Sequence, residues 1–158
     1  MDKKIGLFWL RDDFRITKNN GLIEATKNHN QVVVFYLFKK STYNKQEAQR
    51  WWLSKSLLNF RKNLNDFNIN LEIIKTESFK VFFDKLFKQK DISIYWNKVY
   101  EPDYLKFDYY LSKNLKEKNI SFKICKGNVL NDIDEVKKSD GTPFKVFTPF
   151  WRNAEKYY

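Results

Sequence analysis

The run QVVVFYLF at residues 31–38 decides the fold, because it is apolar almost throughout. Such a run is typical of a strand buried on both faces, as in a parallel sheet covered by helices on each side. Four more short runs have the composition of strands: residues 5–10 (IGLFWL), 71–75 (LEIIK), 92–96 (ISIYW) and 121–125 (SFKIC). The sequence therefore predicts five strands.

Helical patterns separate these strands. After residues 31–38, apolar side chains recur at spacings of four and three on one face of a long helix: Leu53, Leu57, Phe60, Leu64 and Phe67. A second stretch carries Phe79, Phe82 and Leu86, and a third, after Pro102, carries Tyr104, Phe107, Leu111 and Leu115. This alternation predicts an α/β fold, a Rossmann-like open five-stranded parallel sheet flanked by helices, in a single domain spanning residues 1–158.

The composition sets limits on the chemistry. The only cysteine is Cys125 and the only histidine is His29, which argues against a disulfide, a Cys/His zinc site or a Ser-His-Asp triad. Only four glycines occur, and neither G-x-G-x-x-G nor G-x-x-x-x-G-K-[ST] is present. An ordinary dinucleotide or P-loop enzyme is therefore disfavoured, and no metal is expected.

The net charge of +11 suits a polyanionic partner, but lysines scattered along the chain also describe a solvated surface. We therefore expect DNA binding by this chain alone to be weak and sensitive to salt. Charge interrupts the first apolar run after Leu10, and no later run reaches transmembrane length. The expected location is the cytoplasm, with no membrane contact.

Ligands of open α/β sheets bind beyond the carboxyl ends of the strands, which directs attention to the segments after Trp9, Leu37 and Trp96. The last residues, FKVFTPFWRNAEKYY, are too aromatic for a free tail. We expect this run to pack back on the domain or to lead into a further segment.

Three segments resemble the DNA photolyase and cryptochrome family. Residues 7–22 (LFWLRDDFRITKNNGL) are similar to the W-F-R, D-L-R and D-N-x-x-L elements that open the family, with matches at Trp9, Arg11, Asp13, Arg15, Asn19 and Leu22 and departures at Asp12 and Lys18. Residues 96–108 (WNKVYEPDYLKFD) resemble W-N-x-x-Y-E-P-x-x-x-x-x-D, and residues 141–154 (GTPFKVFTPFWRNA) resemble G-x-P-Y-K-V-F-T-P-F-W. Near the first element, we expect Asp13 to form a charged latch with Arg11 and Arg15.

The resemblance implies the N-terminal α/β domain of a deoxyribodipyrimidine photolyase. In the family, a larger helical domain follows and holds the catalytic FAD and the DNA-lesion pocket. We expect that domain to be absent here, so this chain would supply no catalytic residue, bind no catalytic FAD and reach DNA only through an FAD-binding domain in cis or in trans. Its expected function is to bind a light-harvesting antenna pigment and to pass excitation to that FAD for repair of pyrimidine dimers. The alternative is a non-enzymatic cryptochrome-type photoreceptor or a stand-alone docking module.

The resemblance also implies a pigment pocket between the end of the second strand, the start of the long helix and the E-P element. The candidate pigment-binding residues are Phe35, Tyr36, Phe38, Arg50, Asn97 and Glu101. Aromatic rings would stack on the pigment, Arg50 would pair with an anionic group, and Asn97 or Glu101 would hydrogen-bond the ring edge. Core packing is the competing interpretation of Phe35 and Tyr36, and a solvated helix start that of Arg50. An 8-hydroxy-deazaflavin or an FMN or FAD pigment is favoured over folate, because Asp103 and Tyr104 replace the Asn-Glu pair of folate-binding relatives.

Overall fold

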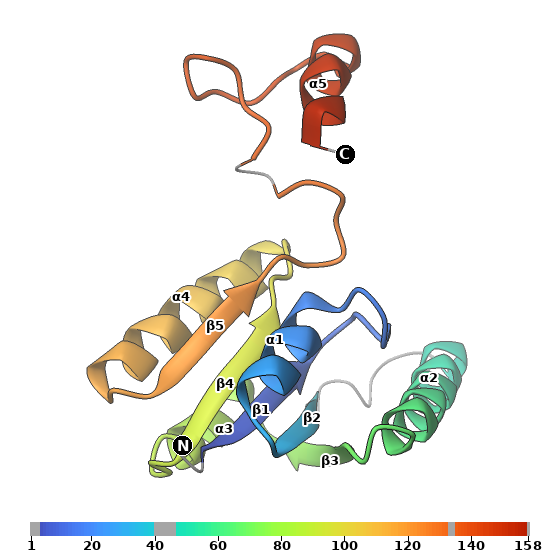
Figure 1. Cartoon of the computed structure of the whole chain (residues 1–158), viewed down its shortest axis with the longest axis vertical. Helices are drawn as coiled ribbons and strands as arrows, with labels where there is room; N and C mark the ends of the chain where they lie inside the picture. The colour runs from blue at the N-terminus through green and yellow to red at the C-terminus, as the bar shows by residue number, and fades with distance from the viewer. Residues whose placement is uncertain (1–3, 40–46, 133–134, 158) are drawn as a thin grey trace.

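Five parallel strands form one sheet in the order β3-β2-β1-β4-β5 (Figure 1). The computed structural model describes residues 4–39, 47–132 and 135–157. The strands are β1 (Ile5–Leu10), β2 (Val32–Lys39), β3 (Asn70–Thr76), β4 (Ile92–Asn97) and β5 (Ser121–Cys125). The α/β fold is confirmed, and every predicted strand agrees with the structure to within one residue at each end. The strand order reverses between β1 and β4, which makes that junction the topological switch point of the sheet.

The helices in the described residues are α1 (Asn20–Asn28), α2 (Glu47–Asn65), α3 (Phe79–Leu86), α4 (Pro102–Glu117) and α5 (Phe147–Ala154), with a final 3-10 turn, η2 (Glu155–Tyr157). The three predicted helices are confirmed as α2, α3 and α4. The sequence patterns did not predict α1 or α5, which have nine and eight residues. At the start of α1 the Asn19 side chain accepts a hydrogen bond from the Leu22 amide at 3.2 Å, and this cap fixes where the helix begins.

The predicted apolar face of α2 extends beyond the end of the helix. The helix ends at Asn65, and Phe67 lies beyond it with its ring exposed. Asn68 adopts a positive φ of 56°, so the chain turns out of the helix there and buries Ile69 instead.

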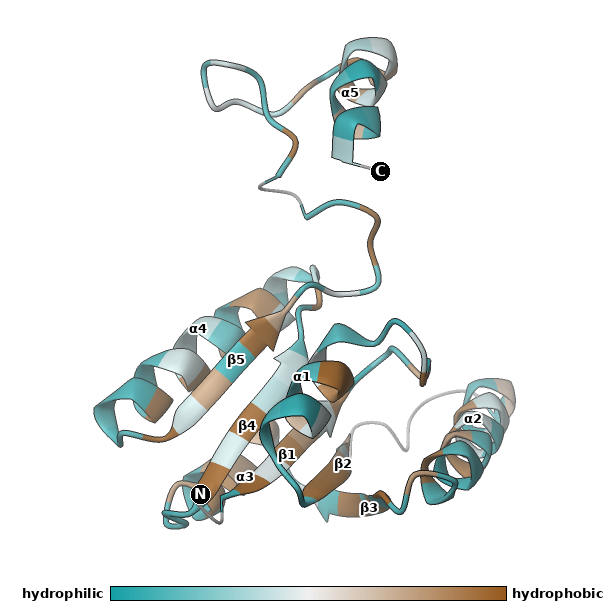
Figure 2. Ribbon diagram, viewed as in Figure 1, coloured by the Kyte–Doolittle hydropathy of each residue, from teal (hydrophilic) through white to brown (hydrophobic). Residues whose placement is uncertain are grey.

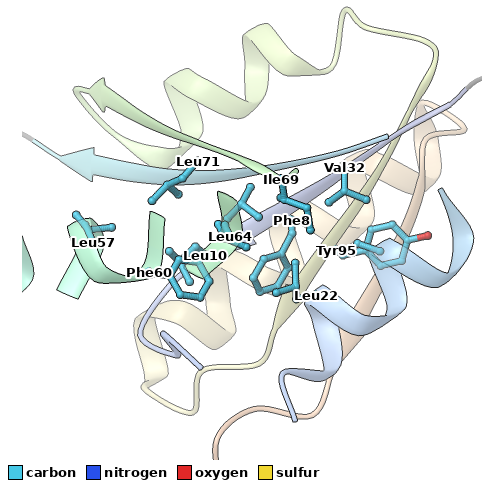
Figure 3. Close-up of a cluster of buried hydrophobic side chains, with 12 residues drawn as sticks. Phe8, Leu10, Leu22, Val32, Leu57, Phe60, Leu64, Ile69, Leu71 and Tyr95 are labelled. Carbon is cyan, nitrogen blue, oxygen red and sulfur yellow. The ribbon is translucent and has the colours of Figure 1, made fainter. Parts of the chain in front are cut away.

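The sheet is covered on both faces, and each face has its own buried cluster. On one face α1 and α2 pack against the strands, and Figure 3 shows side chains from the strands and from these helices pointing toward one another: Phe8, Leu10, Leu22, Val32, Leu57, Phe60, Leu64, Ile69, Leu71 and Tyr95. On the other face α3 and α4 contribute to a second cluster with Trp9, Phe35, Leu37, Phe83, Ile94, Trp96, Leu111 and Leu115. Neighbouring residues of β1 and β2 thus serve opposite cores, as the period of a strand requires. Figure 2 shows hydrophobic residues gathered along the strands.

The C-terminal arm, residues 135–157, extends away from the sheet beyond its carboxyl edge and ends in α5 (Figure 1). None of its residues belongs to either buried cluster. Its rings contact one another instead, with Phe144 and Phe150 centroids 6.4 Å apart. The arm therefore does not pack back on the sheet, which was one of the two predicted outcomes for this run. No helix in the described part of the chain is long and apolar enough to cross a membrane.

Candidate functional site

The switch point is occupied by a buried ion pair. Arg11, the residue after β1, donates from Nη1 to Asp108 Oδ2 of α4 at 3.1 Å and from Nη2 to Asp108 Oδ1. Its guanidinium carbon lies 3.9 Å from the centre of the Trp9 ring. Both partners are almost fully buried, so the pair joins the end of β1 to α4.

Of the predicted charged latch between Asp13, Arg11 and Arg15, only the pair of Asp13 with Arg15 is correct. Asp13 accepts hydrogen bonds from Arg15 Nε and Nη2, both at 2.7 Å, which confirms that pair. Arg11 takes no part in it, because the carboxylate of Asp108 on α4 binds its guanidinium instead.

Two buried asparagines close the other side of the switch point. Asn97, at the end of β4, accepts from the Gly21 amide at 2.8 Å and donates to Asn19 Oδ1 at 2.8 Å. Asn19 in turn donates to the carbonyls of Asp13 and Arg15. These bonds hold the loop between β1 and α1 in place. The crevice that remains has a volume of about 50 Å³, enough for a few water molecules.

A third group of polar residues lies at the rim of this crevice. Lys98 Nζ lies 3.0 Å from Asp132 Oδ1, and the Tyr100 hydroxyl donates to Asp132 Oδ2 at 3.2 Å. Burial, with the neighbouring Asp132 carboxylate as the second cause, raises the pKa of Tyr100 to about 12. At Gly127 a Cβ atom would lie 2.1 Å from the Lys98 carbonyl oxygen, so only glycine allows this close approach. The polar residues of the switch point thus bind one another.

A larger cavity lies between α2 and the carboxyl-terminal halves of β2 and β3, and we call it the α2 cavity. Its volume is about 360 Å³, and it is lined by Phe38, Arg50, Leu53, Ser54, Leu57, Leu58, Arg61, Ile73 and Lys75. The α2 members recur at helical spacings, which places them on one side of that helix. The strand members share a sheet face with Leu71, which belongs to the α1 and α2 core.

The charge in this cavity has one sign. Arg50, Arg61 and Lys75 line it, and none of the described lining residues carries a carboxylate. Arg61 Nη2 donates to the Leu71 carbonyl at 3.3 Å, near the start of β3, whereas Arg50 lies in the first turns of α2. Eleven residues of helix separate the two arginines by about 16 Å. The cavity can therefore accept a long, flat molecule with an apolar body and anionic groups at its ends.

The structure brings together two of the six predicted pigment-binding residues. Phe38 and Arg50 both line the α2 cavity. Phe35 points to the opposite face of the sheet, where its ring centroid lies 5.2 Å from that of Phe82 in the buried cluster of α3 and α4. The competing interpretation, core packing, describes the position of Phe35.

The other three predicted residues lie apart from the cavity. Tyr36 packs against the α1 and α2 core beside Phe14, and burial raises its pKa to about 12. Asn97 holds the switch point. Glu101 is the exposed N-cap residue of α4, and its side chain makes no capping hydrogen bond. The role of all six residues in pigment binding stays a prediction.

The sequence patterns did not point to the residues at the far end of the α2 cavity, Arg61 above all. A signal was present, because Arg50, Leu53, Leu57 and Arg61 follow one another at spacings of three, four and four. The contribution of Ile73 and Lys75 on β3 could not be predicted from the sequence, since it depends on the distance between α2 and the edge of the sheet.

A second cavity, of about 260 Å³, lies on the opposite face at the same edge of the sheet. It is lined by Lys39, Ser78, Phe79, Lys80, Asp103, Tyr104 and Phe107. It contains the two residues that stand in place of the folate-binding Asn-Glu pair. In the described ranges no group of three or more His, Cys, Asp or Glu side chains is arranged to hold a metal ion.

Comparison with known proteins places these features in a family. The family model for DNA photolyase matches residues 6–158. A deoxyribodipyrimidine photo-lyase of Agrobacterium fabrum is 26% identical over 149 residues, which cover 94% of this chain and 31% of that protein. The crystal structure of a bacterial class III photolyase from Agrobacterium tumefaciens has a TM-score of 0.83 and 25% identity, and the match covers 98% of this chain and 32% of that one.

An archaeal photolyase from Sulfolobus tokodaii, solved with two FAD molecules and discussed for a novel light-harvesting cofactor, shares the fold with a TM-score of 0.77 at 24% identity. The match covers 96% of this chain and 35% of that one. The chain thus spans about a third of the length of the relatives it matches.

Proposed function

This chain belongs to the DNA photolyase family, and on that premise we propose that it is the antenna domain of a photolyase, binding a flavin-type pigment in the α2 cavity. In this proposal residues 1–158 are one α/β domain, and the catalytic FAD is held by a separate FAD-binding domain in cis or in trans. Light-dependent repair of pyrimidine dimers is the activity of the assembled protein. In that protein, the pigment held by this chain absorbs light and passes the excitation to the catalytic FAD.

The observation that carries the proposal is the α2 cavity itself. Its volume of about 360 Å³ falls in the range of roughly 300–1,000 Å³ that is usual for small-molecule sites. It lies toward the carboxyl ends of β2 and β3, on the side of the sheet where α/β proteins bind ligands. The archaeal photolyase, solved with two FAD molecules and discussed for a novel light-harvesting cofactor, supports a flavin-type ligand.

The lining residues suit a flavin in particular. Leu53, Leu57 and Ile73 provide apolar surface for a fused ring system. The arginines near the two ends can form charge-assisted hydrogen bonds with a phosphate and with the electron-rich edge of the ring. FMN, FAD and 8-hydroxy-deazaflavin share this chemistry. The protein supplies binding and orientation, while the pigment supplies the absorption of light.

A pigment titration tests the proposal. The purified chain is mixed with FMN, FAD, 8-hydroxy-deazaflavin or methenyl-tetrahydrofolate, and binding is followed by pigment absorption and fluorescence. We expect one of the flavin-type pigments to bind. Loss of a hydrogen bond to a charged group costs about 1.5–3 kcal/mol, so Arg50→Ala should weaken that binding by roughly 10- to 150-fold.

Two further variants locate the site. Ser54 lines the cavity and is exposed, so Ser54→Trp should fill the cavity with a large side chain and abolish binding. Lys62→Ala removes a cation from the same helix outside the cavity and serves as the control. Failure of every pigment to bind, or unchanged affinity in both cavity variants, would contradict the proposal.

A further inference from the structure

A further cavity lies at the edge of the sheet where the strands begin, and we call it the amino-edge groove. It is lined by Thr26 and by residues 29–33 and 67–70, and its volume is about 530 Å³. These residues belong to the turn between α1 and β2 and to the turn between α2 and β3. Pairing of β2 with β3, in which Val33 is opposite Asn70, holds the two turns side by side. The groove therefore lies at the opposite end of the strands from the α2 cavity.

The lining of the groove lacks strongly charged side chains. Lys, Arg, Asp and Glu make up 31% of the chain, yet none of them is among the described lining residues. His29 lines the groove with both ring nitrogens engaged, Nδ1 with the Lys4 carbonyl at 2.9 Å and Nε2 with the Tyr95 hydroxyl at 3.0 Å. A Cβ atom at Gly6 would lie 2.8 Å from His29 Cδ2, so the ring is also packed tightly. His29 thus forms a fixed wall of the groove.

Four side-chain amides line the groove: Asn30, Gln31, Asn68 and Asn70. All four residues are exposed, and none of these side chains hydrogen-bonds another described residue. At the switch point, by contrast, Asn19 and Asn97 hydrogen-bond each other. Each amide has two N–H donors and a carbonyl acceptor. The groove therefore offers both donors and acceptors to a ligand.

An exposed aromatic ring lies in the same groove. Phe67 is 62% exposed, whereas Phe8, Phe60 and Phe83 of the two sheet cores are almost fully buried. The face of an aromatic ring carries partial negative charge, which attracts the weakly positive hydrogens of C–H groups. Phe67 therefore provides a flat apolar surface beside hydrogen-bonding amides.

We propose that the amino-edge groove binds a neutral polyhydroxylated ligand, a sugar of one or two rings. The hydroxyl groups of a sugar donate and accept, as the four amides do. A sugar ring also has a face of C–H groups that can pack on Phe67. The volume of the groove falls in the range of roughly 300–1,000 Å³ that is usual for small-molecule sites. The proposal is independent of the pigment site beside α2.

The lining decides against other classes of ligand. A phosphorylated or carboxylated molecule would leave water without a counter-charge among the described lining residues, which is unfavourable. A purely apolar molecule would cover the amides without replacing their hydrogen bonds to water, which also costs free energy. A neutral molecule with many hydroxyl groups avoids both costs.

The test uses the full ¹⁵N-labelled chain with maltose, cellobiose and trehalose as the sugars. Binding is followed by saturation-transfer-difference spectra of the sugar and by ¹H–¹⁵N correlation spectra of the chain. We expect at least one of the three to bind, with the largest amide shift changes at residues 29–33 and 67–70. Because the ligand is neutral, its affinity should be the same at low and at high salt. FMN should not displace it.

A ring variant and its control test the apolar half of the site. Phe67→Ala should weaken sugar binding by about 2- to 10-fold, as expected for loss of a favourable ring contact. Tyr109→Ala removes a ring that is 75% exposed on α4, outside the groove, and should leave the affinity unchanged.

An amide variant tests the polar half. Asn68 has a positive φ of 56°, which glycine adopts readily, so Asn68→Gly removes the amide without straining the turn. It should weaken binding by about 2- to 10-fold through the loss of one hydrogen bond. Asn59→Ala removes an exposed amide from α2 and is the control. All four substituted residues are exposed, so thermal unfolding followed by circular dichroism should be unchanged.

Four results would overturn the proposal. None of the three sugars binds, or the Phe67 variant binds the sugar as tightly as the Tyr109 variant does. Glucuronate binds more tightly than the neutral sugars and loses its affinity at high salt, which would indicate attraction by charge. Adenosine binds at residues 29–33 and 67–70 and the sugars do not displace it, which would make the groove a site for a flat base.

Discussion

The switch point and the α2 cavity lie toward the same edge of the sheet, but they are built in opposite ways. At the switch point Arg11 binds Asp108 and Asn97 binds Asn19, and the space left over is about 50 Å³. The α2 cavity has about seven times that volume, and its described lining residues include three cations and no carboxylate.

This difference is the reason for proposing the ligand site beside α2 and not at the switch point. The switch point is the expected position for a ligand, and polar residues do gather at the strand ends there. In this chain those residues bind one another, apart from the buried Arg11 Nε, which has no hydrogen-bond partner among the described residues, and the bonds that they form stabilise the fold. Unfilled volume and a cluster of cationic side chains occur together at the flank of the sheet instead, beside α2.

The largest effect is expected at the ion pair of the switch point. Asp108→Ala leaves the guanidinium of Arg11 buried without its carboxylate, and removing one partner of a buried pair costs about 3–5 kcal/mol. Urea unfolding followed by circular dichroism measures this loss. Asp103→Ala, on the exposed side of the same helix, is the control and should leave the unfolding midpoint in place. A stable Asp108 variant would mean that the pair does not hold the switch point.

A smaller loss of stability is expected at Asn97. Asn97→Ala leaves the Gly21 amide and the Asn19 side-chain oxygen without this partner, at a cost of about 1–3 kcal/mol. The same urea experiment applies, with Asn59→Ala on the exposed surface of α2 as the matched control. If Asn97 served a pigment and not the fold, the substitution would leave stability unchanged and weaken pigment binding.

Each region has a tyrosine whose pKa is raised to about 12, Tyr36 on the α2 face and Tyr100 beside the switch point. Because burial favours the protonated form, each contributes stability that is fully present below pH 10 and is lost as the pH rises toward 12. Tyr36→Phe should therefore make the decrease in unfolding free energy between pH 10 and 12 less steep. Tyr100 remains, so part of the decrease persists. An identical decrease in the variant would contradict the burial of the Tyr36 hydroxyl.

The smallest effect on stability is expected at the α2 cavity. Arg50 is exposed, so Arg50→Ala should change the unfolding free energy by no more than about 0.5 kcal/mol, which is usual for surface substitutions. The same variant should lose most of its affinity for the pigment. A loss of stability as large as that of the Asp108 variant would mean that Arg50 serves the fold and not a ligand.

The sequence predicted the sheet well because the strands carry a strong local signal. The apolar run at residues 31–38 is buried on both faces in the structure, as its composition required. The short helices were not predicted, because their local sequence signal is weak. In α1 only Leu22 and Ala25 add apolar side chains to the core, too few to show a helical period, and its start depends on the Asn19 cap.

The candidate site was harder to predict because it depends on distances between elements. Phe35 and Tyr36 are adjacent and both aromatic. Nothing in the sequence of residues 31–38 indicates which face of the sheet each side chain packs on. The partner of Arg11 is 97 residues away on α4, so Asp13 was the nearer and wrong choice. Arg50 and Phe38 were found together because both stand where the chain passes from β2 to α2.

The most direct test of the central claim, that the flavin-type pigment lies beside α2 and not at the switch point, is a map of amide chemical shifts. The ¹⁵N-labelled chain is titrated with FMN, and ¹H–¹⁵N correlation spectra are recorded. We predict the largest changes for residues 50–61 and 73–75. Changes confined to residues 9–13 and 97–100 would contradict the account and return the ligand to the switch point.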